Sequence, residues 1–123
     1  MSDTQKILIV EDNNFVRMQL VKFLSEEGYD IIESTDGKDA LEKMNDDIAI
    51  AIVDVRMEPI DGFEFVRTLR GKDIETPVML VTGDQNPDLL EKATSHGVRT
   101  VLMKPVQKDR LVSMVSRTLQ KGS

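Results

Sequence analysis

Acidic and basic side chains and one hydroxyl follow four apolar runs of the sequence, at the point where each run ends. Glu11 and Asp12 follow the first run, Asp54 follows the longest, and Thr82 and Lys104 follow two later ones. Carboxylates bind divalent cations, while an ammonium group and a hydroxyl bind phosphoryl oxygens. If the four runs end side by side, these five residues form one site.

Three carboxylates in one place repel one another and tend to keep their protons unless a cation lies between them. Mg²⁺ suits such a site because it accepts a few carboxylates together with water and phosphate oxygens, and Mn²⁺ can take its place. Lys104 could then pair with a phosphoryl oxygen, and Thr82 could donate its hydroxyl to another. In this interpretation Asp54 is the nucleophile and forms an aspartyl phosphate.

Each of these residues also has an ordinary structural explanation. Asp54 and Thr82 would open turns, Lys104 would be a solvated strand end, and Glu11 with Asp12 would cap the following helix. For any one residue this explanation is at least as good as the functional one. Five residues of suitable types at the ends of four separate runs are harder to obtain by chance, and this favours a single site.

Alternating strand and helix signals must position these side chains. The run 48–53 lacks polar alternation, which is typical of a strand covered on both faces, as in a parallel sheet. The expected strands are 7–10, 30–34, 48–53, 77–81 and 100–103, each followed by an expected helix. This alternation predicts an α/β, doubly wound parallel sheet of order 2-1-3-4-5 with helices on both faces. In that order the first and third strands are neighbours, so Asp12 and Asp54 should converge.

The helix expected after Thr82 has a clear start signal. Asn86 is a good cap and Pro87 suits the first helical position. Leu89, Leu90 and Ala93 are expected on its inner face.

Composition limits the function. Residues 1–123 are expected to form one domain, with 1–5 and 121–123 frayed. The net charge of -6 argues against direct nucleic-acid binding, and the lack of cysteine excludes disulfides and thiolate metal sites. The polar first residues and the absence of a long apolar stretch predict a cytoplasmic protein without a membrane segment.

The motifs resemble those of the receiver domain of two-component response regulators over nearly the whole chain. The matching stretches are residues 7–12, ending in Glu11-Asp12; residues 54–57, with Asp61-Gly62 beyond them; Thr82-Gly83; and Lys104-Pro105. The resemblance implies a flavodoxin-like (βα)5 fold.

The resemblance also implies roles. Asp54 would accept a phosphoryl group from a histidine kinase or histidine phosphotransfer protein, and the domain would then act on a downstream protein or output domain. Glu11, Asp12, Asp54 and the backbone carbonyl of Arg56 would serve Mg²⁺. Thr82 and Lys104 would contact the phosphoryl group, and a cis bond before Pro105 would hold Lys104 in place.

The sequence departs from the family pattern at several positions. Many receivers carry a proline four residues after the phosphorylated aspartate. Here Glu58 occupies that position, and Pro59 follows one place later. Val101 stands where many receivers carry the Tyr or Phe that turns inward on activation, and Val106 stands where Phe is common. The usual threonine-aromatic switch cannot operate with valine. The signal either leaves by another route, such as the loop and helix after Thr82, or is weak; both valines otherwise serve as packing residues.

Arg56 and Asp84 occupy positions that tune phosphoryl lifetime in this family, two residues beyond Asp54 and Thr82. Their opposite charges suggest that they approach each other and shield the phosphoryl group from water. Two independent solvated charges are an equally good explanation.

Two other function classes remain. A pure interaction domain would keep the fold without phosphoryl transfer, which the complete acidic, Thr and Lys set disfavours and Val101 allows. A phosphohydrolase would want a second carboxylate where Arg56 stands. We therefore expect a signalling module that catalyses only its own phosphorylation and dephosphorylation, rather than an enzyme. The sequence does not decide whether the chain forms a homodimer through its last helices. It also does not decide whether the domain is free-standing or a piece of a longer regulator.

Overall fold

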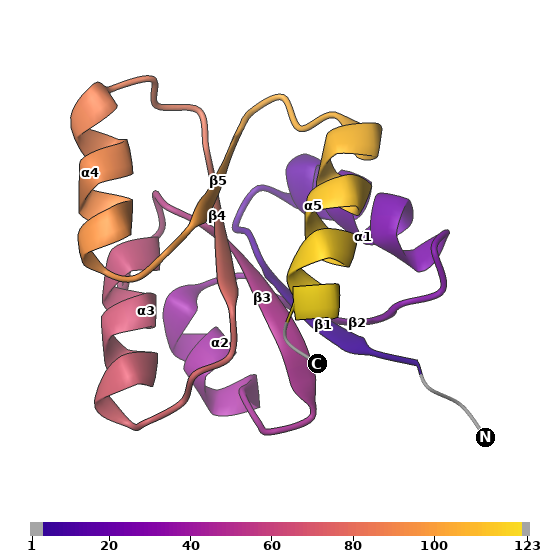
Figure 1. Ribbon diagram of the computed structural model, residues 1–123, viewed down its shortest axis with the longest axis horizontal. Coiled ribbons are helices and arrows are strands. Elements are labelled where there is room, and N and C mark those ends of the chain that lie inside the picture. Colours follow the sequence, from indigo (N-terminus) through magenta and orange to yellow (C-terminus); the bar gives the residue numbers. More distant parts are fainter. Residues whose placement is uncertain (1–3, 122–123) are drawn as a thin grey trace.

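The computed structural model describes residues 4–121, in which five strands and five helices alternate (Figure 1). The strands are β1 (Lys6–Val10), β2 (Asp30–Ser34), β3 (Ile48–Asp54), β4 (Val78–Thr82) and β5 (Thr100–Met103). The helices are α1 (Asn14–Ser25), α2 (Gly37–Lys43), α3 (Gly62–Gly71), α4 (Pro87–Ser95) and α5 (Lys108–Lys121). All five expected strands are present. Near the amino end, the Gln5 carbonyl accepts a hydrogen bond from the Asp30 N–H, and residues 1–3 and 122–123 of the expected frayed ends lie outside the described residues.

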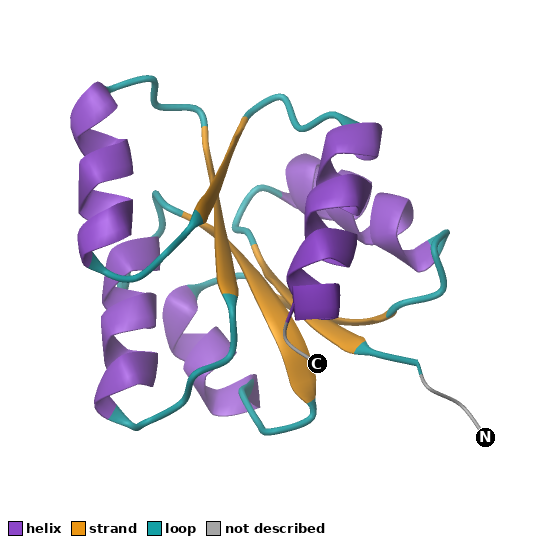
Figure 2. Ribbon diagram, viewed as in Figure 1, coloured by secondary structure: helices purple, strands orange, loops and turns teal. Residues whose placement is uncertain are grey.

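The five strands form one parallel sheet of order β2-β1-β3-β4-β5, which confirms the predicted fold class and strand order. Helices α1 and α5 cover one face, and α2, α3 and α4 cover the other (Figures 1 and 2). No helix within residues 4–121 is long and apolar enough to cross a membrane.

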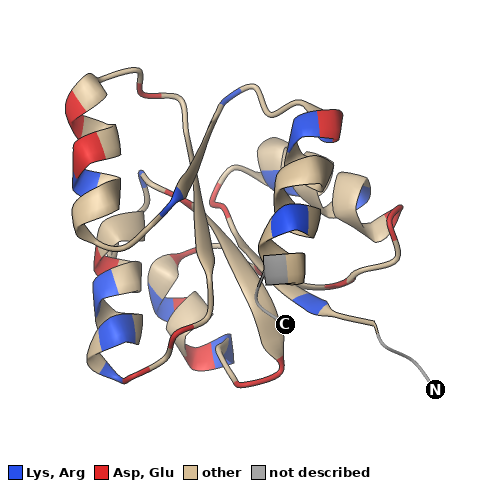
Figure 3. Cartoon of the chain, viewed as in Figure 1, with Lys and Arg blue, Asp and Glu red and all other residues tan. Residues whose placement is uncertain are grey.

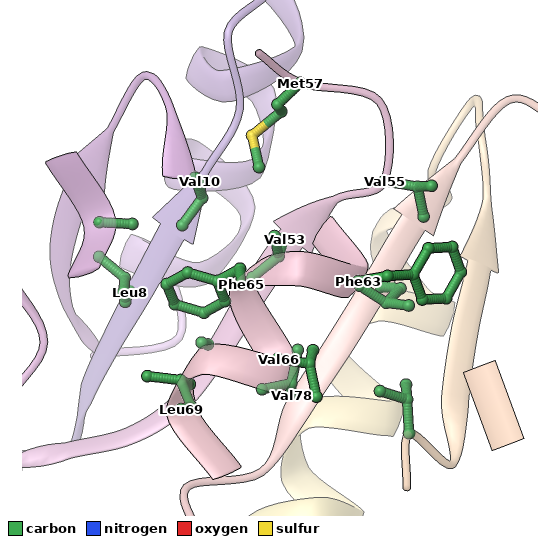
Figure 4. Packing of buried hydrophobic residues seen from close by; sticks show 14 of the residues in the cluster. Leu8, Val10, Val53, Val55, Met57, Phe63, Phe65, Val66, Leu69 and Val78 are labelled. Carbon is green, nitrogen blue, oxygen red and sulfur yellow. The ribbon is translucent and has the colours of Figure 1, made fainter. Parts of the chain in front are cut away.

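The covered faces explain the continuous apolar strands. In β3, Ile50 and Ile52 pack with the α1 and α5 side chains, while Ala51 and Val53 pack with those of α2, α3 and α4. Successive side chains of a strand point to opposite faces, so both sets must be apolar. Figure 4 shows the second cluster, in which Phe65 of α3 lies against the strand side chains.

Gly62 brings the start of α3 close to the end of β3. A Cβ atom on Gly62 would lie 2.8 Å from the Asp54 carbonyl oxygen and 3.0 Å from the Val55 Cα. The Gly62 N–H donates to the Val55 carbonyl at 2.9 Å, and Asp61 caps α3 by accepting from the Glu64 N–H. The Asp61-Gly62 pair therefore fixes the loop that follows Asp54.

Helix α4 begins as expected and packs differently. The Asn86 side chain accepts from the Asp88 N–H and Pro87 occupies the first turn. The prediction for Leu90 is wrong, because its side chain is 57% exposed whereas Ala93 is buried. Leu89 and Ala93 are four residues apart and share one stripe, while Leu90 is turned by about 100° from Leu89. Only that narrow stripe packs against the core.

Candidate functional site

Three carboxylates meet where β1 and β3 end. One oxygen from each of Glu11, Asp12 and Asp54 lies within 4.8 Å of the others. Glu11 and Asp54 are buried, at 1% and 6% exposure, and Asp12 is exposed. Acidic residues in the loop between β1 and α1 are visible in Figure 3. The sheet order thus brings together the acidic residues that the sequence singled out.

Two groups fix Glu11. The Asn13 N–H donates to its Oε2 at 3.1 Å, and the Arg17 Nη1 donates to its backbone carbonyl at 2.8 Å. Arg17 also forms an ion pair with Glu33 on β2, at 3.1 Å. Sequence reasoning missed Arg17. Nothing in the sequence distinguished it from Lys22, the other charged residue of the same helix.

Lys104 joins the carboxylates from the end of β5. Its Nζ lies 3.0 Å from Glu11 Oε1 and 3.4 Å from Asp54 Oδ1. Burial by itself would lower the pKa of Lys104, but the two carboxylates outweigh it and raise this pKa, so the ammonium stays charged. The Lys104 N–H donates to the Thr82 carbonyl at 2.8 Å, and the bond before Pro105 is cis, as expected.

The donor set suits a hard divalent cation. Burial raises the pKa of Glu11, against the lowering effects of Lys104 and the Asn13 N–H, and the nearby Asp54 adds to the rise. Glu11 Oε1 is buried, and the Lys104 ammonium lies 3.0 Å from it. A cation shared by Glu11, Asp12 and Asp54 would relieve the repulsion between the three carboxylates. The chemistry of the residues therefore fits Mg²⁺.

Thr82 lies beside Asp54 at the end of β4 and is buried. Its Oγ1 accepts a hydrogen bond from the Asp84 N–H at 3.0 Å. Since a hydroxyl can accept one hydrogen bond and still donate its proton, the Thr82 proton remains available to an acceptor bound at Asp54.

Arg56 and Asp84 join the loops that follow β3 and β4. Arg56 Nη2 donates to Asp84 Oδ2 at 2.6 Å, so the expected approach of these residues is confirmed. Both residues line a cavity of about 410 Å³ together with Asp54, Thr82 and Lys104. The Asn86 N–H and then Arg56 hold the pKa of Asp84 below its usual range, so the pair stays charged.

Val101 and Val106 pack against opposite sides of the sheet. Val101 is partly buried against the cluster under α2, α3 and α4, and Val106 is partly buried against the other cluster. Both valines therefore have the packing role considered for them.

Comparisons with known proteins agree with this geometry. A sequence model of the response regulator receiver domain matches residues 7–116. The sensor protein EvgS of Escherichia coli strain K12 is 36% identical over 93% of this chain, which spans 10% of that protein. The transcriptional regulatory protein HprR of the same strain is 33% identical over 94% of the chain, which spans 52% of HprR. The chain thus corresponds to one part of each of these relatives.

Solved structures show the same fold. The chemotaxis response regulator CheY4 of Vibrio cholerae matches with a TM-score of 0.85 and 28% identity, over 94% of this chain and 98% of that one. A response regulator receiver protein from Pseudomonas putida matches with a TM-score of 0.86 and 26% identity, over 95% and 99%. On the family match, the fold and the converging strand ends together, the chain belongs to the response regulator receiver domain family.

Proposed function

We propose that this receiver domain accepts a phosphoryl group on Asp54 from a phosphohistidine donor and uses it to change partner binding. The observation that carries the proposal is the position of Lys104, whose Nζ lies 3.4 Å from Asp54 Oδ1 and 3.0 Å from Glu11 Oε1. A fixed ammonium beside a buried carboxylate supplies a partner for the charge that a phosphoryl group brings.

Glu11, Asp12 and Asp54, with the backbone carbonyl of Arg56, would hold Mg²⁺, and Mn²⁺ would serve in its place. When bound, the cation neutralises charge on the phosphoryl oxygens. The close approach of the three carboxylates supports this assignment.

In the transfer, an Asp54 carboxylate oxygen attacks the phosphorus of the donor. An O–P bond forms as the P–N bond to the donor's imidazole breaks, and the imidazole leaves as a neutral ring when its other nitrogen carries a proton. Lys104 pairs with one phosphoryl oxygen, and Thr82 donates its free hydroxyl proton to another. The chain thereby catalyses its own phosphorylation, and later hydrolysis of the aspartyl phosphate returns it to the starting state.

Incubation with Mg²⁺ and acetyl phosphate tests the chemistry. We expect a mass gain of about 80 Da, the size of one phosphoryl group, confined to the peptide that contains Asp54. The gain should disappear in Asp54→Asn and on chelation of the metal, and it should persist in Asp46→Asn, a matched change of an exposed aspartate. A gain that survives Asp54→Asn, or no gain in the unmodified chain, contradicts the proposal. The second outcome would favour a pure interaction domain.

The exposed face of α1 is our candidate docking surface for the phosphohistidine donor. Phe15 and Met18 are 70% and 66% exposed, and they lie three residues apart near the start of α1. Helix α1 begins at Asn14, two residues after Asp12, so this apolar pair lies in the first turns after the acidic residues. A donor protein must bring its histidine to Asp54, and an apolar contact next to the site provides a place to bind.

The Arg56–Asp84 pair would control how long the phosphoryl group lasts. The pair spans two loops beside the cavity that holds Asp54, so it limits the approach of water from that side. We further propose that the signal leaves through the loop between β4 and α4, since Val101 cannot act as the aromatic switch.

A further inference from the structure

A second cavity, of about 410 Å³, lies at the amino ends of the strands, whereas Asp54 lies at their carboxyl ends. The first residues of β4 and β5 and the second half of α5 line it, together with Ile50 of β3. Ile50 precedes Asp54 by four strand residues, which is about 13 Å. The cavity is therefore separate from the phosphoryl-transfer site.

The floor of this cavity is apolar. Ile50, Met79 and Val78 line it and are 0%, 1% and 6% exposed. Pro77 and Met114 add further apolar surface. A cavity of this volume with an apolar floor is typical of a small-molecule site and would bind a flat or aliphatic group.

Three arginines line the same cavity. Arg70 is held in place because its Nη1 donates to the carbonyls of Ile74 at 2.8 Å and Thr76 at 3.0 Å. Arg99 and Arg117 are exposed. None of the three takes part in an ion pair among the described residues 4–121. Within the part of the chain that the structure describes, no carboxylate pairs with these guanidinium groups.

This cluster of positive charge contrasts with the whole chain, which has a net charge of -6. Glu75 is the single acidic residue that lines the cavity, and it too lacks an ion-pair partner among the residues described. Guanidinium groups bind carboxylates, sulfonates and phosphates by paired hydrogen bonds. We propose that the cavity is a binding site for a small organic anion whose apolar part lies on the Ile50–Met79 floor and whose charged group meets Arg99 and Arg117.

Titration of the whole chain with 1-naphthalenesulfonate, followed by amide NMR signals, tests this assignment. We expect saturable shifts at the amides of Met79, Gly97, Thr100 and Thr118. The neutral analogue 1-naphthalenemethanol should bind about tenfold more weakly or worse, because it lacks the charge-assisted hydrogen bonds. The same shifts should appear in Asp54→Asn, since the site is independent of phosphoryl transfer.

Arginine variants make the test specific. Arg99→Gln and Arg117→Gln should each weaken binding of the sulfonate by about tenfold, and Glu75→Gln should strengthen it by removing the competing carboxylate. Arg67→Gln is the matched control, because Arg67 is exposed on α3 and does not line the cavity. Unchanged amide signals away from the cavity show that each variant is folded. Equal binding of the neutral analogue, an equal loss in Arg67→Gln, or the absence of saturable shifts overturns the proposal.

Discussion

Removal of the Arg56–Asp84 pair should shorten the lifetime of the aspartyl phosphate while leaving the fold intact. The pair consists of one 2.6 Å contact, with the Arg56 side chain 77% exposed and that of Asp84 25% exposed. It covers one side of the cavity that holds Asp54, so water keeps other approaches. Because exposed pairs are only weakly coupled, we expect the half-life to fall about two- to fivefold.

The variants Arg56→Ala and Asp84→Asn distinguish the effect of the ion pair from the effect of the loop conformation. Asp84→Asn keeps the side-chain oxygen that accepts the Asn86 N–H, so it removes the charge and leaves this turn in place. Each variant is phosphorylated with acetyl phosphate. Mass spectrometry then follows the loss of the adduct of about 80 Da, which is one phosphoryl group. The double variant should decay no faster than the faster single variant, and about 1 M salt should shrink the differences.

The pH dependence follows from the lowered pKa of Asp84. A carboxyl with a lowered pKa in the folded state keeps its interaction above the usual value of 3.8 and loses it as the pH falls through the lowered value. The ratio of wild-type to variant half-life should therefore stay constant from about pH 5 to pH 8. Unchanged decay in both single variants refutes the shielding, and independent, multiplying effects in the double variant refute the coupling.

Four other substitutions test the docking surface, the loop after β3 and the metal ligands. Phe15→Ala and Met18→Ala should each slow transfer from a phosphohistidine protein by about tenfold and leave phosphorylation by acetyl phosphate unchanged, as measured by initial rates with both donors. Gly62→Ala should lower the free energy of unfolding by about 1–3 kcal/mol, measured by urea denaturation, because its Cβ would meet backbone atoms. Mg²⁺ should raise the thermal midpoint of the wild type, and Asp12→Asn should abolish most of that rise; an equal rise in the variant contradicts the assigned ligand set.

The fold and the converging residues could be predicted because they follow from local sequence signals. A strand covered on both faces must be apolar throughout, which made 48–53 recognisable, and the alternation with helices allowed few sheet orders. Once β1 and β3 are neighbours, Glu11, Asp12 and Asp54 must meet at one edge. The approach of Arg56 to Asp84 was expected from family positions and opposite charges, and only the three-dimensional structure supplies the 2.6 Å contact.

Other features depend on how elements pack, which no local signal contains. Leu90 has the spacing of an inner residue, yet α4 packs through a stripe too narrow to include it. Arg17 donates to the backbone carbonyl of Glu11. Any residue at that position would offer the same carbonyl, so the sequence does not predict this hydrogen bond. The arginine-lined cavity joins α3, β5 and α5, and only the tertiary structure brings Arg70, Arg99 and Arg117 together.

The hydrogen bonds after β4 indicate how the chain can signal without an aromatic switch. The Thr82 Oγ1 accepts from the Asp84 N–H, Asp84 Oδ1 accepts from the Asn86 N–H, and Asn86 Oδ1 accepts from the first turn of α4. A phosphoryl group that binds the Thr82 hydroxyl and attracts Arg56 acts on both ends of Asp84, and thus on the cap of α4. Leu90 lies one turn beyond that cap, on the exposed side of the helix. If the signal takes this proposed route, the exposed Leu90 lies on the helix whose cap the signal reaches.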